Sequence, residues 1–431
     1  MIITTDTTLA PGVYHLPAGI TIAADGVTLD GAGATLVGAG RAGRGISVEG
    51  RQGVTIRNVR LLEYYHGIAA YDCADLTIAG CTISATAEEP PNTLFLDIWR
   101  TAAQAYGGAI FLHQVRNSQV LNNDLQHQQN GLLCYGCARL AVRGNLASYC
   151  SGFGLHFFDS SDNLVEDNCA DFCCRYQPRA GHAGHLGADA AGFLTAHGSC
   201  RNTFRNNLAR MGGDGFFLAG LRPDWTHVPC DDNLFEGNDG SYSPNIGFEA
   251  TFSSGNRFVN NLADACNYGF WLGFSTNNLV EGNSICDNRR AGVAVENGVG
   301  CTVRDNRFER NAYGLLLWSK HVAAFATALP QNDTSRDWLI ERNSFAHNGT
   351  AVRIAADQDH GLRSLPAANP RCPAPHGHTL RENNIAESRL GIETIGALAT
   401  RLERNQMRAN LEGDLRESGG EAFAGDYFIK G

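Results

Sequence analysis

The feature that most constrains this chain is a short motif that returns along most of its length. An apolar residue precedes Asn by three positions, as in Val165-Glu-Asp-Asn168, Val280-Glu-Gly-Asn283 and Leu402-Glu-Arg-Asn405. A second short segment and then Gly-apolar-x-apolar complete the unit, as in Gly154-Leu-His-Phe157. The unit recurs about eleven times with a period of roughly 22 residues. Such recurrence in one register is not a property of ordinary loops, and it predicts a solenoid of stacked coils.

Each part of the repeat has a physical reason. Stacked Asn residues at a turn are expected to hydrogen-bond the backbone of the next coil and so form a ladder. Gly is expected to permit a sharp entry into the last strand. Because side chains alternate along a strand, the first residue after that Gly should face the interior. These inward positions are Ile68, Leu132, Leu155, Phe193, Phe216, Phe248, Phe270, Val293, Leu315 and Val352.

Other repeat architectures fit poorly. The Leu-x-x-Leu-x-Leu pattern of leucine-rich repeats is absent, and a propeller needs a period of about 40 residues or more. The pattern instead resembles the right-handed parallel β-helix repeat superfamily, which includes pectate lyases, polygalacturonases, inulin fructotransferases and sugar-hydrolase β-helix proteins. The resemblance spans roughly residues 30 to 410. It implies an all-β fold, a right-handed parallel β-helix of about 12 coils, and it leaves the activity open.

The expected organisation has three parts. Residues 1–50 are predicted to form an N-terminal cap and the first coils, residues 51–410 the β-helix, and residues 411–431 a C-terminal tail. A cap is expected because an open solenoid end exposes unpaired strand edges and apolar core. Long insertions interrupt the repeat beside the Gly-apolar strand, at residues 85–105, 177–190, 221–231, 320–336 and 357–377. Loops that wall one face of a solenoid usually mark its binding face.

Charge and composition limit the partners. The net charge of −10 disfavours nucleic acid and anionic membranes as partners. The start of the chain has neither the basic nor the long apolar region of a secretory signal, and no apolar run is long enough to cross a membrane. The expected location is therefore cytoplasmic, with a secreted mature form as the alternative.

The spacing of the cysteines does not predict a metal site. The 14 Cys residues are scattered through the repeat, which is typical of reduced and buried thiols. Cys173 and Cys174 lie near His182 and His185, but no Cys-x-x-Cys spacing supports zinc. The sequence thus predicts neither a metal nor a cofactor.

The outward positions of the Gly-apolar strands are unusually aromatic. A solvated sheet face would carry Thr, Lys, Ser and Glu, whereas aromatic rings with sparse polar groups suit sugar rings. The expected partner is an oligosaccharide substrate. The predicted substrate-binding residues are His156, His197, His113, Phe217, Trp271, Trp318, Arg353 and Tyr135. Two alternatives are that the long loops bury these aromatics, and that a homotrimer packs through this face.

Two outward carboxylates fit glycoside cleavage. Glu249 and Glu296 are expected two coils apart and two residues apart along the strand, with Cα atoms roughly 12 Å from each other. Paired carboxyl groups are what glycoside hydrolysis needs. Asp159 and Asp214 are further catalytic candidates, and the loops add Asp189, Asp224, His227, Asp357 and His360. The predicted function is cleavage of a neutral oligo- or polysaccharide by a glycoside hydrolase or a fructotransferase-like enzyme.

Two other functions remain open. A lyase or epimerase acting on uronic acids needs a positive charge on the substrate carboxylate and a base at the sugar carbon, for which Arg353, Lys320 and His156 are candidates. A non-catalytic protein that binds a sugar or a metal is the third possibility, because His113, His156 and His197 lie on neighbouring coils.

Overall fold

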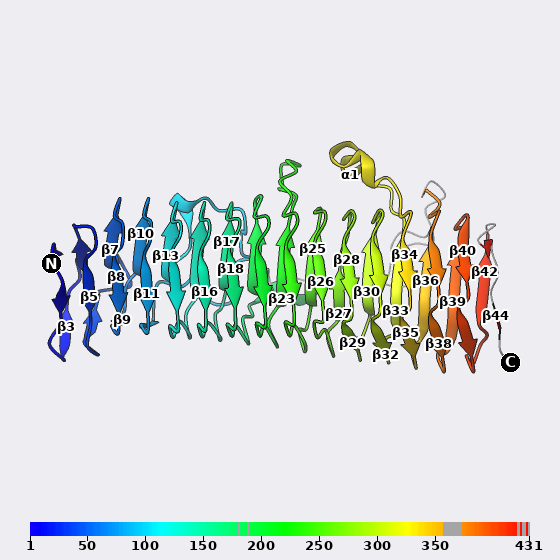
Figure 1. The fold of residues 1–431 in the computed structure, drawn as a ribbon, viewed down its shortest axis with the longest axis horizontal. Coiled ribbons are helices and arrows are strands. Elements are labelled where there is room, and N and C mark those ends of the chain that lie inside the picture. Colours follow the sequence, from blue (N-terminus) through cyan, green and yellow to red (C-terminus); the bar gives the residue numbers. More distant parts are fainter. Residues whose placement is uncertain (180–181, 188, 357–372, 420–422, 425–427, 430–431) are drawn as a thin grey trace. The chain divides into compact units, whose positions relative to one another are not determined.

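The computed structural model describes residues 1–179, 182–187, 189–356, 373–419, 423–424 and 428–429. It divides into two compact units, Met1–Phe217 and Leu218–Gly431. Within each unit, short strands of successive coils pair in parallel and in register, as the repeated arrows of Figure 1 show. Each unit is a right-handed parallel β-helix, which confirms the predicted fold class.

Three strand positions recur in the coils of unit 1. Sheet A contains β1 (Ile2–Ile3), β4 (Ile20–Ile22), β7 (Arg44–Glu49), β10 (His66–Tyr71), β13 (Gly108–His113), β15 (Leu132–Tyr135), β17 (Phe153–Phe158), β21 (Ala191–Ala196) and β23 (Asp214–Ala219). Sheet B contains β2 (Thr7–Thr8), β5 (Thr28–Asp30), β8 (Thr55–Arg57), β11 (Thr77–Ala79), β14 (Gln119–Leu121), β16 (Ala141–Arg143), β18 (Leu164–Glu166) and β22 (Thr203–Arg205). Sheet C contains β3 (Val13–His15), β6 (Thr35–Val37), β9 (Arg60–Leu62) and β12 (Thr82–Ser84).

Unit 2 repeats this arrangement. Its sheet A strands are β25 (Ile246–Thr251), β27 (Tyr268–Trp271), β30 (Ala291–Glu296), β33 (Tyr313–Trp318), β36 (Thr350–Ala355), β39 (Leu390–Ile395) and β42 (Leu415–Ser418). Its sheet B strands are β24 (Leu234–Glu236), β26 (Arg257–Val259), β28 (Leu279–Glu281), β31 (Thr302–Arg304), β34 (Leu339–Glu341), β37 (Thr379–Arg381), β40 (Thr400–Glu403) and β43 (Phe423–Ala424). Its sheet C strands are β29 (Ser284–Cys286), β32 (Arg307–Glu309), β35 (Ser344–Ala346), β38 (Asn384–Ala386), β41 (Gln406–Arg408) and β44 (Phe428–Ile429).

The insertions supply the remaining elements. Unit 1 carries η1 (Ala102–Gln104) and an antiparallel hairpin of β19 (Tyr176–Arg179) and β20 (His182–Leu186), and unit 2 carries α1 (Ala323–Ala328) and η2 (Pro330–Asn332). Among the described residues, none of these helices is long and apolar enough to cross a membrane. Sheet A positions in the described part of the chain total 16, more than the twelve coils expected, because residues 1–50 already contribute three such strands. The predicted division into cap, β-helix and tail stays a prediction.

The predicted interior is confirmed. All ten residues predicted to face inward are at most 1% exposed. Rings of neighbouring coils stack inside both units: Phe193 and Phe216 have centroids 4.8 Å apart, and Phe248 and Phe270 are 4.9 Å apart. No single coil buries its apolar side alone, so stacking creates the core.

The asparagine ladder is also present. In unit 2, the Oδ1 atom of Asn283 accepts hydrogen bonds from the backbone and side-chain nitrogens of Asn261, at 2.8 and 3.0 Å. Asn283 donates in turn to Asn306 Oδ1 and to the carbonyl of Phe258. Each buried amide therefore joins two coils and satisfies a backbone group that the turn leaves unpaired.

The repeated glycine acts differently from expectation. A Cβ atom on Gly154 would lie 2.5 Å from Ala170 Cβ and 2.6 Å from the carbonyl oxygen of Gly192. A Cβ on Gly292 would lie 2.7 Å from the carbonyl oxygen of Gly314. Neither glycine has a positive φ. The residue is needed because the next coil passes too close for a side chain.

Candidate functional site

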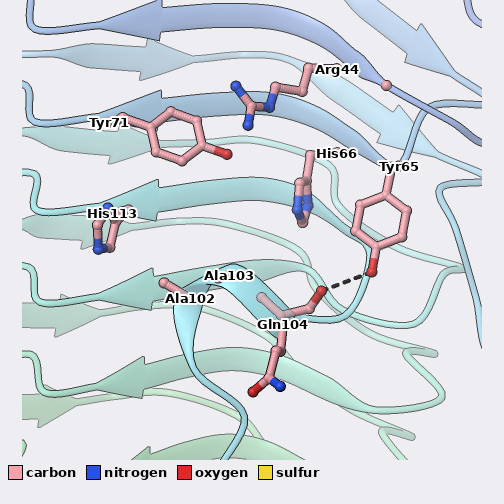
Figure 2. A pocket seen from close by; sticks show the side chains of 10 residues that line it. Arg44, Tyr65, His66, Tyr71, Ala102, Ala103, Gln104 and His113 are labelled. Atoms are coloured by element: carbon pink, nitrogen blue, oxygen red, sulfur yellow. Dashed lines mark hydrogen bonds between the residues drawn. The ribbon is translucent and has the colours of Figure 1, made fainter.

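Unit 1 carries a cavity of about 620 Å³ on the outer face of its sheet A. The strands β7, β10 and β13 form its floor, and η1 crosses beside it (Figure 2). Figure 2 shows Arg44, His66, Tyr71 and His113 on one side of these strands. The lining residues are Gly43, Arg44, Tyr65, His66, Tyr71, Ala102, Ala103, Gln104, Ala105 and His113.

A segment that we call the roof loop, residues 85–107, forms one wall of this cavity through residues 102–105. The hydroxyl of Tyr65 donates a 2.8 Å hydrogen bond to the carbonyl of Ala105, the dashed line of Figure 2. Within the loop, the guanidinium carbon of Arg100 lies 3.9 Å from the centroid of the Tyr106 ring. These contacts hold η1 over the strands and give the cavity a defined wall.

His66 is the buried base of this cavity. Its ring stacks on Phe111, with centroids 4.7 Å apart, and meets Tyr65 edge-on. Its Nδ1 atom has no hydrogen-bond partner among the described residues. Burial, with a smaller contribution from the Arg44 charge, lowers the pKa of His66 to about 4. The imidazole is therefore neutral at physiological pH and able to accept a proton.

Arg44 supplies the positive charge. Its guanidinium carbon lies 4.4 Å from the centroid of the Tyr71 ring, in cation–π range. Burial raises the pKa of Tyr71 despite the opposing effect of Arg44, so the phenol keeps its proton. None of the residues that line this cavity is a carboxylate, although Glu49 pairs in register with Tyr71 on the neighbouring strand and its charge also raises the pKa of Tyr71.

A second cavity of about 360 Å³ continues the first. Both are lined by Ala102, Ala103 and His113, and together they form one groove along sheet A of unit 1. Three predicted site residues meet in the second cavity, namely His113, Tyr135 and Asp159. Asp159 is exposed and has a φ of +49° directly after β17. The groove thus acquires one carboxylate at this end.

The two other predicted histidines of unit 1 differ in exposure. His197 stacks on Phe158, with centroids 4.4 Å apart, and is half-buried. His156 is 1% exposed, and neither of its ring nitrogens has a partner among the described residues. Burial lowers the pKa of His156 to about 3. His156 packs edge-on against Tyr135 beneath the groove and does not line it.

Buried neutral histidines predict a loss of stability in mild acid. His66, His156 and, by burial, His378 have folded-state pKa values of about 4, 3 and 3, below the ordinary 6.5. The unfolded chain binds more protons below pH 6.5, so unfolding becomes easier as the pH falls through this range. We expect each histidine to contribute about 1 kcal/mol per pH unit to this slope.

Denaturant melts between pH 7.5 and 5 measure that slope. Replacing His156 by Phe keeps an aromatic ring in its aromatic surroundings and removes the titrating group. We expect His156→Phe to reduce the slope of the unfolding free energy against pH by the contribution of one titrating group, about 1 kcal/mol per pH unit. An unchanged slope would show that His156 does not stay neutral in the folded chain.

The predicted carboxylate pair lies in unit 2. Glu249 on β25 pairs in register with Trp271 on β27, and Trp271 pairs with Ala294 on β30, two residues before Glu296. The predicted offset of two coils and two residues is therefore present. Glu296 is 9% exposed, and its Oε2 atom lies 3.2 Å from Lys320 Nζ. Trp271 remains half-buried beside this pair.

Besides His156 and Glu296, four more predicted site residues that line neither cavity of the groove are buried. Trp318 is 1% exposed and packs with Ala294, Leu316 and Ala355. Arg353 is 3% exposed, and its Nε lies 3.0 Å from Glu393 Oε2 on the next coil. Asp214 and Phe217 on β23 are buried as well. The period of two identifies the outward positions correctly, but it contains no information about what covers them.

The candidate site residues in the loops differ in their exposure and in whether they line a cavity. His227 lines a small cavity of unit 2, Asp224 is exposed, and Asp189 is half-buried. Asp357 and His360 lie outside the described residues. In the described part of the chain, no group of three or more His, Cys, Asp or Glu side chains is placed to hold a metal ion.

The predicted site residues do not include Arg44, His66 and Tyr71, which line the main cavity. Arg44 and His66 occupy the position just before the repeated Gly, and Tyr71 lies at the end of the same strand as His66. Counted from Glu249, strict alternation would turn the residue before the Gly inward. In the structure the alternation breaks at the Gly, and Tyr268 and Tyr313, which hold that position in unit 2, pack with the outer-face residue Trp318. The period of two therefore gives no signal for Arg44 and His66, which precede the Gly on neighbouring coils.

Two family models match parts of the chain. One describes a periplasmic copper-binding protein, NosD, and matches residues 188–363. The other describes a right-handed β-helix region and matches residues 97–241. No curated protein matches the sequence.

Solved structures share the fold at low identity. A double mutant of the periplasmic alginate epimerase AlgG has a TM-score of 0.50 and 12% identity, covering 86% of this chain and 79% of that one. The A-module of an Azotobacter vinelandii mannuronan C-5 epimerase, AlgE6, has a TM-score of 0.41 and 13% identity, covering 98% and 91%. The catalytic domain of a GH87 α-1,3-glucanase has a TM-score of 0.32 and 10% identity, covering 99% and 64%. The strand ladders and the family match to a β-helix region agree on the fold, a right-handed parallel β-helix.

Proposed function

We propose that this chain is a carbohydrate-active enzyme that removes the proton beside the carboxylate of a uronic acid residue, in the groove of unit 1. The observation that carries the proposal is the lining of the main cavity. It combines Arg44, a buried neutral histidine and the protonated phenol of Tyr71, and none of its lining residues is a carboxylate. Those groups match the needs of carbanion chemistry next to a carboxylate.

Each group has a distinct task in this reaction. Arg44 pairs with the substrate carboxylate and stabilises the charge that moves onto it when the C5–H bond breaks. His66 accepts that proton on an imidazole nitrogen. Return of a proton to the opposite face inverts C5, and departure of the C4 oxygen instead leaves an unsaturated uronide. Tyr71 is the proton donor in either branch, because its phenol stays protonated.

An anionic substrate also improves the base. The charge of Arg44 helps to keep the pKa of His66 low. A carboxylate bound to Arg44 would offset that charge and raise the pKa of His66, although burial, the larger cause of the low pKa, would remain. The base thus becomes stronger only when the substrate is in place.

The groove has the shape of a site for an oligosaccharide. The second cavity adds Tyr135 and Phe158 beyond His113 along the same sheet. Coils repeat about every 4.8 Å, which is close to the length of one sugar residue in an extended chain. Aromatic rings along this track offer apolar surfaces to successive sugar rings.

Hydrolysis of a neutral glycan by Glu249 and Glu296 is the second candidate. Their register, two coils apart beside Trp271, favours it, because both hydrolytic mechanisms need two nearby carboxyl groups. Lys320 next to Glu296 would keep that carboxylate ionised, which suits a nucleophile or base and leaves the acid role to Glu249.

One experiment separates the two reactions. The full chain is incubated in D₂O with oligouronates and with neutral oligosaccharides, and products are followed by NMR, by ultraviolet absorbance of unsaturated uronides and by new reducing ends. We expect deuterium at C5 of the uronate, or an unsaturated product, and an equal result for a Glu249→Gln/Glu296→Gln double variant. Reducing ends from neutral glycans that disappear in the double variant would replace the first proposal by the second.

A further inference from the structure

Unit 2 contains a small polar cavity that the proposed function does not use. It has a volume of about 50 Å³ and lies at the turns after β25 and β27, where two insertions meet. Figure 1 shows both insertions, one before β24 and one carrying α1, on the same edge of this unit. The polar residues that line the cavity are His227, Asp231, Ser253, Ser254, Thr276, Gln331 and Asn332.

Asn332 contributes a buried side-chain oxygen that lacks a hydrogen-bond donor among the described residues. The residue is 1% exposed, and its Oδ1 atom has no hydrogen-bond partner among the described residues. Its Nδ2 atom donates to the carbonyls of Asn297, at 2.9 Å, and Ser275, at 3.3 Å. Rotating the amide would set its oxygen against both carbonyls, so the orientation is determined. A buried acceptor of this kind needs a donor or a cation.

Asp231 adds a negative charge to the same cavity. Its Oδ1 accepts a 2.6 Å hydrogen bond from the backbone N–H of Ser254. Burial raises the pKa of Asp231, so the ionised form is costly in the bare cavity. The Nε2 atom of the nearby His227 lies 2.8 Å from the carbonyl oxygen of Phe252. It donates its hydrogen bond to that oxygen, so this N–H is not available to a ligand in the cavity.

Aromatic side chains border one side of the cavity. Phe325 of α1 lies 4.5 Å from Phe274 and 5.6 Å from Phe252, by ring centroids, and Phe252 and Phe274 both line the cavity. Trp225 meets Phe325 edge-on at 5.2 Å. The insertions therefore border a partly open polar space that has room for one ion or one or two waters.

We propose that this cavity binds a hard cation, Ca²⁺, through the carboxylate of Asp231 and the amide oxygen of Asn332. Hard cations choose carboxylate, amide and hydroxyl oxygens, and Ser254, Thr276 and Gln331 line the space with further oxygens. A site with a single carboxylate and mostly neutral oxygens binds weakly, with a dissociation constant of about 10⁻⁴–10⁻³ M. The ion ties the two insertions of unit 2 to the turns of sheet A.

Calorimetric titration of the full chain with CaCl₂ tests the proposal. We expect one Ca²⁺ per chain in the stated range, and at least about tenfold weaker binding by Asp231→Asn. Asp232→Asn is the matched control, because this exposed neighbour carries the same charge and does not line the cavity. Thermal melts without calcium check that Asp231→Asn folds.

A second readout locates the ion. Terbium is a luminescent substitute for Ca²⁺, and Trp225 is close enough to the cavity to sensitise it. We expect the emission to be displaced by Ca²⁺ and lost in Trp225→Phe, while that variant still binds Ca²⁺ by calorimetry. A wild-type chain without a calcium heat, or an Asp231→Asn variant that binds as tightly as Asp232→Asn, would overturn the proposal and leave water as the occupant.

Discussion

Replacing His66 by Gln should lower kcat/KM for a uronate-containing oligosaccharide by about 10²–10⁴-fold. Gln is polar and similar in length, but it cannot accept a proton. His66 is the buried neutral base of the main cavity, so its loss removes the proton acceptor while Arg44 still binds the carboxylate. Steady-state rates and exchange of the C5 proton with D₂O measure the effect, and KM should change much less than kcat.

Two further observations check this assignment. His15→Gln is the matched control, because His15 is exposed on β3 and does not line either cavity of the groove. In the wild-type chain, kcat/KM should decline in acid as His66 of the free enzyme is protonated near its pKa of about 4. A His66→Gln variant that keeps wild-type kcat and C5 exchange would remove His66 from the mechanism.

Replacing Asn283 by Ala should destabilise unit 2 by about 3–4 kcal/mol. The side chain accepts from two nitrogens of Asn261 and donates to the carbonyl of Phe258 and to Asn306. Alanine leaves these buried groups without partners, and each such group costs about 1–3 kcal/mol. Urea denaturation followed by circular dichroism measures the change in the free energy of unfolding.

Asn260→Gly is the comparison for this experiment. Asn260 is exposed at a turn with a φ of +53°, a conformation that glycine adopts freely. We expect its effect to stay within about 0.5 kcal/mol, since an exposed turn residue away from such a network contributes little. Equal effects at both positions would mean that the ladder contributes no more than an ordinary turn.

The position of the charged residue that lines the main cavity was the least predictable part of this protein. The sequence suggested Arg353 and Lys320 as cations for a uronate, but both lie next to carboxylates, Glu393 and Glu296. Residues 1–50 were expected to form an N-terminal cap and the first coils, and no residue of this segment was among the predicted site residues. In the structure, β7 of that segment continues sheet A and places Arg44 beside Tyr71 of the next coil.

The repeat alone determined the coil architecture. The spacing of apolar residues, Gly and Asn decided which side chains point inward, where the asparagine ladder runs and which residues share the outer face of sheet A. These are properties of local backbone geometry, repeated from coil to coil. For this reason the same rule predicts the burial of residues as far apart in sequence as Ile68 and Val352, and both are fully buried.

Only the tertiary structure decided which outward residues are open to a ligand. Trp318 and His156 became buried, whereas Arg44, Tyr71 and His113 line a groove. Whether an outward side chain meets solvent depends on the path of a loop that belongs to no repeat, such as the roof loop held by Tyr65. Loop paths follow from many distant contacts that are not periodic. The periodicity that specifies the coils therefore does not predict which residues form the site on them.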